Sequence, residues 1–329
     1  MRVFVTGSTG FVGSAVVRDL ISAGHQVLGL ARSDEAAQRL AVAGAQVHRG
    51  DLEDLDSLRQ GAAKSDGVIH TGFNHDFSNF KKNCENDRKA IQALGSVLAG
   101  SARPLIVTSG IGLLPSARLA TEETMPVSPN PNPRVASEEA AREVADRGVH
   151  VSVVRLPPSV HGDGDHGFVP ILINIAREKG VSAYIGEGAN RWPAVHRLDA
   201  AHLFRLALEK SAPRTYYHGV AEEGVTFREI AEVIGQRLNI PVAGKSSDEA
   251  ASHFAWFAHF AAMDVQASSK QTQEVLGWRP AQPGLIADID RPSYFKFRPT
   301  EAQDANDGKY HPDYRRGFRD RVSARRRVC

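Results

Sequence analysis

Short apolar runs alternate along the chain with longer segments in which apolar residues recur every three or four positions. Residues 2–5 form the first such run, and the apolar positions of residues 14–24 fall on one helical face. The same succession repeats as far as residue 156. We expect further strands at residues 25–31, 45–49, 67–70, 105–110 and 149–156. Apolar strands separated by amphipathic helices predict an α/β fold with a parallel, doubly wound sheet.

Three glycines connect the first strand to the first helix. Gly7, Gly10 and Gly13 have the spacing Gly-x-x-Gly-x-x-Gly. The first permits a tight turn, the second lets a pyrophosphate approach the backbone, and the third allows helix and strand to pack closely. The N-terminus of the helix then faces the phosphates. The turn predicts a dinucleotide site rather than an ordinary strand–helix connection. Its expected contacts are Gly7, Thr9, Gly10, Phe11, Val12 and Gly13.

The end of the second strand is where such a fold meets the adenosine ribose. Arg32 and Ser33 stand at this position. A guanidinium matches the oxygens of a 2′-phosphate, whereas an acidic residue would bind a free 2′-hydroxyl. Arg32 therefore favours NADP(H) over NAD(H). Asp34 leaves NAD(H) open, and the alternative for Arg32 is a solvated charge at a helix entry.

Two residues after the third strand lie on the side expected to hold the adenine. The Asp51 carboxylate can accept a hydrogen bond from the adenine amine, and Leu52 can pack on the ring. The alternative role of Asp51 is to cap the helix that runs through Leu55 and Leu58.

With these motifs the chain resembles the short-chain dehydrogenase/reductase superfamily, and in particular its extended branch. The resemblance covers about residues 1–290 and rests on residues 6–13, 50–52, 68–71, 107–109, 155–162, 195–201 and 268–278. It implies a Rossmann core that binds a nicotinamide cofactor. It also implies that the segment at Pro157 and Pro158 forms a stiff wall for the nicotinamide ring. Further cofactor contacts are expected from Thr71, Gly72, Pro157, Ser159 and Val160.

The chain departs from that family where the family performs its chemistry. The family's Tyr-x-x-x-Lys pair occurs nowhere in the sequence. Arg134 stands where the tyrosine would be, and Glu138 where the lysine would be. The family's serine falls on Ser109 or Gly110, in a register that is ambiguous by one residue. The resemblance thus implies an atypical member, which keeps the dinucleotide site and replaces the usual acid/base residues.

The sequence offers substitutes for the missing proton donor. His161 follows the nicotinamide segment, and an imidazole titrates near neutral pH. His75 follows the fourth strand, at the sheet edge where ligands bind. Ser109 is placed to hold a substrate oxygen. Arg134 can polarise a carbonyl, but its pKa is too high for it to donate a proton. Tyr184 is a more remote option.

Three other groups of residues admit two interpretations each. Residues 161–168 include two histidines and two aspartates, but their glycines favour a substrate loop, so we expect no metal. Arg197 or His196 lies at the mouth of the pocket, or else Asp199 caps the following helix while Arg197 pairs with it. The aromatic residues of 253–263 are expected in a core or a dimer face, with a ligand wall as the alternative.

Composition and charge narrow the class of protein. The 329 residues carry a net charge of +2, so we expect neither nucleic acid nor membrane as a partner. The first strand runs directly into the glycine turn, so we expect no signal peptide. Two cysteines predict a reducing compartment, which is the cytoplasm. We expect a Rossmann core at 1–155, a segment at 156–295 that completes the core and forms a substrate lobe, and a polar, Arg-rich tail at 296–329.

These features favour an NADP(H)-dependent oxidoreductase that acts on a small or medium carbonyl or hydroxyl compound and uses a substitute proton donor. A homodimer is left open. The missing Tyr and Lys motivate a second hypothesis, a non-redox isomerase or cyclase or a nucleotide-responsive regulator on the same scaffold. A sugar-nucleotide epimerase or dehydratase is a weaker alternative, because those reactions also need the absent base.

Overall fold

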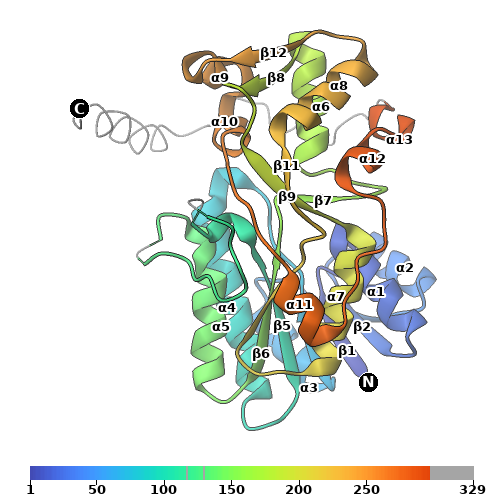
Figure 1. The fold of residues 1–329 in the computed structure, drawn as a ribbon. Coiled ribbons are helices and arrows are strands. Elements are labelled where there is room, and N and C mark those ends of the chain that lie inside the picture. Colours follow the sequence, from blue (N-terminus) through green and yellow to red (C-terminus); the bar gives the residue numbers. More distant parts are fainter. Residues whose placement is uncertain (116–117, 129, 297–329) are drawn as a thin grey trace.

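The computed structural model describes residues 1–115, 118–128 and 130–296, and at its centre is a seven-stranded parallel sheet (Figure 1). Helices cover both faces of this sheet, which explains why its strands are continuously apolar. The predicted α/β, doubly wound architecture is confirmed. In spatial order the strands are β10 (Thr215–His218), β6 (His150–Leu156), β5 (Pro104–Gly110), β4 (Gly67–His70), β1 (Arg2–Thr6), β2 (Gln26–Ala31) and β3 (Gln46–Arg49).

The order of the strands determines where a ligand binds. From β1 the chain adds β2 and β3 on one side, then crosses over to add β4, β5 and β6 on the other. The carboxyl ends of β1 and β4 therefore form the topological switch point, the position at which open α/β sheets bind ligands. The six strands expected from sequence are all present. The seventh, β10, comes from a short segment that follows α7 and has no strong apolar signal.

Six helices pack on the two faces of the sheet. Val16 and Leu20 of the first helix and Phe204 of the seventh belong to one buried cluster, and Leu94 and Val144 belong to the cluster on the opposite face. The first face is covered by α1 (Phe11–Ser22), α2 (Asp34–Val42) and α7 (Arg197–Lys210), and the second by α3 (Leu55–Ala63), α4 (Phe80–Leu98) and α5 (Ala136–Asp146).

A smaller lobe lies over the carboxyl edge of the sheet (Figure 1). It has its own buried cluster, which includes Trp192, Phe227 and Phe257. Its strands are β7 (Ser159–His161), β9 (Arg191–His196) and β11 (Glu222–Thr226) in one sheet, and β8 (Ser182–Ile185) and β12 (Val242–Lys245) in another. Its helices are α6 (Phe168–Lys179), α8 (Phe227–Leu238), α9 (Ser247–Phe254), α10 (Ala258–Ala261), α12 (Leu285–Ile289) and α13 (Pro292–Phe295).

Short elements complete the described chain. They are α11 (Lys270–Leu276) and the 3-10 turns η1 (Phe77–Asn79), η2 (Ile111–Leu113), η3 (Pro133–Val135) and η4 (Ala255–Phe257). Within the described residues no helix is both long and apolar enough to cross a membrane. Apart from Lys296, the predicted polar tail lies outside the described residues.

Candidate active site

The glycine turn is pressed against the end of β4. Gly7 has φ +63°, and a Cβ added to it would lie 2.6 Å from the backbone nitrogen of Gly72. A Cβ on Gly13 would lie 2.0 Å from the carbonyl oxygen of Gly7, so helix α1 approaches the turn as closely as backbone allows. Gly10 N–H donates to the Gly7 carbonyl at 2.9 Å. The turn thus has the geometry of a pyrophosphate cradle at a helix N-terminus, and the residues present fit a dinucleotide.

Hydrogen bonds fix the start of the β4–α4 connection beside this cradle. The Thr71 hydroxyl donates to the Thr6 carbonyl at 2.8 Å, and Gly72 N–H donates to the Thr6 hydroxyl at 3.2 Å. A Cβ on Gly72 would lie 2.8 Å from Leu52 Cδ2. The structure therefore brings Thr71, Gly72 and Leu52 together next to Gly7, as expected for residues that contact one cofactor.

Asp51 does not cap the following helix. The cap of α3 is Asp54, whose carboxylate accepts from Ser57 N–H at 3.1 Å. The Asp51 carboxylate accepts only from Glu53 N–H, at 2.9 Å, within the described residues. The capping alternative for Asp51 was therefore wrong, because α3 begins at Leu55 and Asp54, immediately before it, is its cap. An adenine contact for Asp51 stays a prediction.

Arg32 is exposed and makes no hydrogen bond or ion pair with the rest of the described chain. Ser33 is the N-cap of α2 and accepts from Ala36 N–H at 3.2 Å. Asp34, the residue that left NAD(H) open, is paired with Arg49. The guanidinium of Arg32 is thus available to a ligand at the start of a helix, where an anion is favoured.

Glu138 occupies the lysine position of the family motif and is fully buried. Arg155 of β6 donates to it from Nε at 2.8 Å and from Nη2 at 2.9 Å. The Ser109 hydroxyl also donates to Glu138, at 2.7 Å. Ser109 is buried too, and its proton is used in this contact. The expected role of Ser109, to hold a substrate oxygen, is therefore limited to its lone pairs.

Arg134 occupies the tyrosine position and is bound by a second polar group. Its Nη1 donates to Asp87 at 2.7 Å and to Ser137, and its Nη2 donates to the Thr108 carbonyl at 3.2 Å. The guanidinium also stacks over the Phe73 ring, 4.1 Å from its centroid. Of the five N–H groups of arginine, Nε–H and one Nη2–H remain for a ligand.

Asp87 holds this second group together. Its carboxylate lies 2.9 Å from His70 Nε2, while His70 Nδ1 lies 2.7 Å from the Thr6 hydroxyl. Burial opposes ionisation of Asp87, but Arg134 and the hydrogen bonds from His70 and Ser137 outweigh it, and the pKa of Asp87 is lowered. An ionised Asp87 therefore anchors Arg134 close to the end of β4.

His75 and Arg134 both contact the Phe73 ring, and His75 is open to solvent on one side. Protein atoms surround the rest of the ring, and this burial, together with the charges of Arg134 and His166, lowers the pKa of His75 to about 4. Its edge meets the Phe73 ring at 5.0 Å. At neutral pH His75 is therefore an uncharged imidazole, which carries one N–H donor and one acceptor nitrogen.

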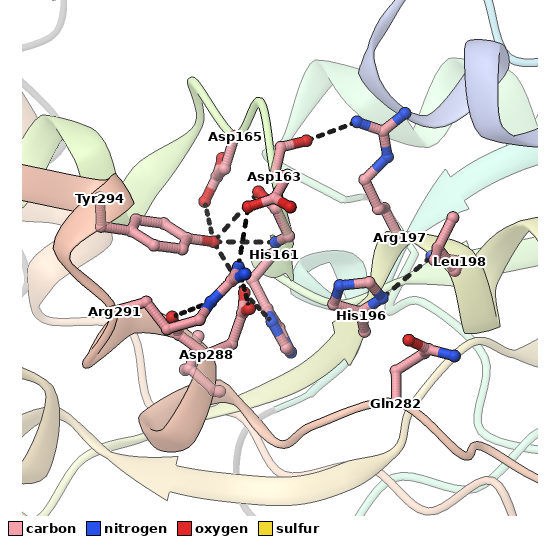
Figure 2. A network of polar contacts seen from close by, with 12 residues as sticks. His161, Asp163, Asp165, His196, Arg197, Leu198, Gln282, Asp288, Arg291 and Tyr294 are labelled. Atoms are coloured by element: carbon pink, nitrogen blue, oxygen red, sulfur yellow. Dashed lines mark hydrogen bonds and ion pairs between the residues drawn. The ribbon is translucent and has the colours of Figure 1, made fainter. Parts of the chain in front are cut away.

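His161 belongs to a separate network between β7 and the C-terminal helices (Figure 2). It is fully buried, and its Nδ1 lies 2.9 Å from Asp288 while its Nε2 has no partner among the described residues. The Tyr294 hydroxyl joins the network by donating to Asp288 at 3.0 Å and accepting from Gly162 N–H at 2.8 Å. The structure does not bring His161 into contact with His75 or Arg134.

Asp165 adds a titrating group that sequence reasoning missed. Its carboxylate accepts from Gly167 N–H at 2.7 Å and lies 3.5 Å from the Tyr294 hydroxyl (Figure 2). Burial raises the pKa of Asp165 to about 6, against the hydrogen bond from Gly167 and the nearby His166 and His161. Its only sequence signal was its place in the 161–168 loop. No group of three or more metal-ligating side chains occurs among residues 1–115, 118–128 and 130–296.

The residues before α7 are used differently from the capping prediction. His196 caps the helix and accepts from Leu198 N–H at 3.3 Å. Asp199 instead accepts from the backbone N–H groups of Ala281 and Gln282, each at 3.0 Å. The alternative in which Asp199 caps this helix and pairs with Arg197 was therefore wrong, because Asp199 is turned toward a segment about eighty residues away.

Arg197 reaches the glycine turn. Its Nη2 donates to the Ser14 hydroxyl at 3.1 Å, its Nη1 donates to the Asp163 carbonyl at 2.6 Å, and its guanidinium lies 4.7 Å above the Phe11 ring. It therefore links the cofactor cradle to the 161–168 loop. Tyr184, the remote proton-donor option, lies on β8 beside Arg228.

The segment expected to contact the nicotinamide, residues 157–160, leads from β6 into the smaller lobe. Pro157 is buried, Ser159 begins β7, and Val160 pairs with Val195 of β9. The Ser159 hydroxyl is buried and has no hydrogen-bond partner among the described residues. A ligand would satisfy this group, so the nicotinamide contacts stay a prediction that the geometry permits.

Known proteins are similar to this chain over most of its length. The NAD dependent epimerase/dehydratase family matches residues 3–219. An uncharacterized protein of Schizosaccharomyces pombe is 52% identical over 295 residues, which are 90% of this chain and 100% of that protein. A 4-hydroxy-2-methyl-3-oxo-4-farnesyl-3,4-dihydroquinoline-1-oxide ketoreductase of Stigmatella aurantiaca is 30% identical over 190 residues, which are 54% of this chain and 56% of that protein. A solved dTDP-glucose 4,6-dehydratase of Streptomyces venezuelae with bound NAD has a TM-score of 0.72 at 19% identity, covering 90% of this chain and 97% of that one.

Proposed function

The chain belongs to the NAD dependent epimerase/dehydratase family, and we propose that within this family it is an NADP(H)-dependent oxidoreductase of a carbonyl or hydroxyl compound. The observation that carries the proposal is the close approach of Gly13 to Gly7 at the switch point, because this approach is what a pyrophosphate cradle requires. The similarity to a ketoreductase, over about half of each chain, supports oxidation–reduction at a ketone.

The preference for NADP(H) rests on the end of β2. Arg32 is exposed and unpaired within the described chain, and Asp34 is paired with Arg49. A 2′-phosphate would meet a free guanidinium next to the N-terminus of α2, whereas a 2′-hydroxyl would find its acidic partner engaged.

A nicotinamide held in this cradle would provide the hydride for reduction of a carbonyl carbon, or would accept it from an alcohol. The free N–H groups of Arg134 polarise the carbonyl oxygen, because Asp87 and the Thr108 carbonyl hold the guanidinium in place. His75 delivers the proton. Its ring N–H is given to the substrate oxygen while the opposite nitrogen takes a proton from a solvent water, and the hydroxide left behind is neutralised by a proton from bulk solvent, so that the imidazole stays neutral. Glu138 accepts from Ser109 of β5 and from Arg155 of β6, so this buried group ties α5 to both strands.

A second candidate is a non-redox, nucleotide-responsive protein. It is favoured by the fact that both positions of the missing Tyr and Lys are engaged in ion pairs, Arg134 with Asp87 and Glu138 with Arg155. An isomerase or cyclase on this scaffold shares that motivation. A sugar-nucleotide epimerase or dehydratase has less support, because the likeness to the solved dehydratase shows the fold alone.

Oxidation of NADPH with a panel of ketones and aldehydes tests the proposal. We expect turnover, and we expect His75→Gln to lower kcat about a hundredfold while the Kd for NADPH changes little. His202→Gln, a partly buried histidine of α7, is the matched control and should not change kcat. Tight NADPH binding without turnover of any carbonyl would overturn the reductase and favour the nucleotide-responsive protein.

A further inference from the structure

A band of aromatic side chains connects the catalytic end of the sheet to the lobe. His75 lies 5.0 Å from Phe73 and 6.4 Å from Phe77 of η1, measured between ring centroids. Phe77 lies 5.6 Å from Trp256 of η4 and 5.7 Å from Phe260 of α10. We call these five residues the aromatic rim. They come from segments about 180 residues apart in sequence, and the fold brings them into direct ring contact.

The rim returns to the cofactor cradle at its other end. Phe260 lies 4.7 Å from Phe168, the first residue of α6. His166, two residues earlier, lies 5.7 Å from Phe11 of the glycine turn. His166 is also close enough to His75 for its charge to lower the pKa of that imidazole. The aromatic contacts thus run from the end of β4 to Phe168 at the start of α6, and His166 of the separate pair with Phe11 lies two residues before Phe168 in the chain.

The side chains of the rim are not fully buried in the core of the lobe. In the 253–263 segment, Phe254 and Phe257 are buried in the lobe, whereas Trp256 is 40% exposed and Phe260 is partly exposed. His75 is exposed as well, and Phe77 is only partly buried. The segment therefore divides into a face that stabilises the lobe and a face that meets η1. Exposed aromatic groups gathered beside a cofactor cradle indicate a ligand surface.

The rim has little charge with which to bind a phosphate. His75 is neutral at pH 7, and Arg134, which stacks over Phe73 of the rim, has its charge balanced by Asp87 and keeps only two N–H groups for a ligand. The diphosphate of a sugar nucleotide would lose water against aromatic faces without gaining an unpaired cation from the rim, which is costly. A flat ring loses little on leaving water and stacks on these faces, with a gain of about 0.5–1.5 kcal/mol for each aromatic contact.

We propose that the aromatic rim binds the substrate, and that this substrate is an uncharged ketone or aldehyde carried on a flat aromatic or polycyclic ring system, not a sugar nucleotide. The position of the carbonyl rests on the proposed function. The recognition of the ring rests on the rim alone.

Trp256 provides a direct readout of binding. The protein has three tryptophans, and Trp192 and Trp278 are fully buried, so iodide quenching reports on Trp256. With the full-length protein saturated with NADP⁺, we expect 2-acetonaphthone to protect Trp256 from iodide and UDP-glucose to give no protection. Protection by UDP-glucose but not by 2-acetonaphthone would overturn the inference.

Substitutions in the rim provide the second test. Phe77→Leu and Phe260→Leu should each raise the KM for 2-acetonaphthone about three- to tenfold, and more than the KM for 2,3-butanedione. The matched control is Val275→Ala, an exposed apolar residue of α11, which should change neither KM. If the rim substitutions shift only the sedimentation of the protein, the rim is a face between two copies and the inference fails.

The outcomes separate this inference from the proposed function. If the protein reduces ketones but the rim substitutions do not change KM, the proposed oxidoreductase is supported and the proposed class of ligand is refuted. Protection of Trp256 by 2-acetonaphthone without turnover of any carbonyl would refute the oxidoreductase and support the ligand class.

Discussion

Glu138 and Arg155 are joined by two hydrogen bonds, of 2.8 and 2.9 Å, and neither side chain is exposed to solvent. Glu138 occupies the position of the family's catalytic lysine. Its charge is neutralised by Arg155, which lies on β6. The position has changed from a group that acts on a substrate to one that ties α5 to β6. The chemistry proposed for this protein therefore depends on other side chains at the end of β4.

Glu138→Gln should strongly destabilise the protein. The substitution leaves the Arg155 guanidinium buried without its counter-charge, which costs about 3–5 kcal/mol of the free energy of unfolding. Urea denaturation followed by circular dichroism measures this quantity. The control is Glu139→Gln in the next position, which removes an ion pair of a half-exposed carboxylate with Arg88 and should cost less than about 1 kcal/mol. Equal losses of unfolding free energy in the two variants would contradict the role of Glu138 as the buried counter-charge of Arg155.

Arg32→Ala should weaken the binding of NADPH but not the binding of NADH. Loss of a charge-assisted contact with the 2′-phosphate is worth about 1.5–3 kcal/mol, so the Kd for NADPH should rise about tenfold to a hundredfold. The Kd for NADH should stay the same, because no 2′-phosphate is present. Titration calorimetry with both cofactors is the measurement. Arg59→Ala, an exposed arginine of α3 paired with Asp56, serves as control and should leave both Kd values unchanged. A parallel loss of NADH affinity in Arg32→Ala would argue against the phosphate contact.

Two alanine substitutions in the glycine turn should have different effects. In Gly13→Ala the new Cβ meets the Gly7 carbonyl oxygen at 2.0 Å, so helix α1 has to move and the protein should lose about 1–3 kcal/mol or more of stability. In Gly10→Ala the nearest atom is 3.1 Å away, so stability should fall much less. Both variants should lose NADPH affinity: the methyl group added in Gly10→Ala faces the expected pyrophosphate, and Gly13→Ala displaces the N-terminus of α1 that the pyrophosphate would meet. Thermal unfolding with and without NADPH gives both quantities, and a stable, NADPH-binding Gly13→Ala would refute the cradle.

Asp165 should make stability depend on pH. Its pKa is raised to about 6 in the folded protein, so the folded state binds a proton more tightly than the unfolded state. The protonated form is fully present below about pH 4, and its stabilising contribution is lost as the pH rises through about 6. Asp165→Asn, which stays uncharged, should therefore be more stable than the wild type at pH 8 by up to about 3 kcal/mol, and the difference should vanish near pH 4.

Urea denaturation across this pH range measures the Asp165 effect. Asp163→Asn, two residues away and exposed, is the control and should show a flat difference. A difference between Asp165→Asn and the wild type that grows toward low pH would show that the carboxylate, not the acid, is the favoured form.

The sequence by itself determined the parts of this protein that depend on neighbours in the chain. The spacing of Gly7, Gly10 and Gly13 between an apolar run and a helical period specified the cradle, because a tight turn, a close approach and a helix N-terminus are local requirements. The structure also contains a capping box between Thr226 and Glu229 at the start of α8, and this interaction is likewise local. The alternation of strands and helices specified the doubly wound sheet.

Only the tertiary structure decided how the polar residues are used. Glu138 meets Arg155 and Asp87 meets Arg134 across elements, and Asp199 turns away from its own helix to bind residues 281 and 282. His161 looked like an available imidazole until the fold placed Asp288, 127 residues later, against it in a buried site. Periodicity assigns a residue to a face, but the partner on that face comes from a distant segment. The pKa and the availability of each side chain therefore follow from packing that no local pattern records.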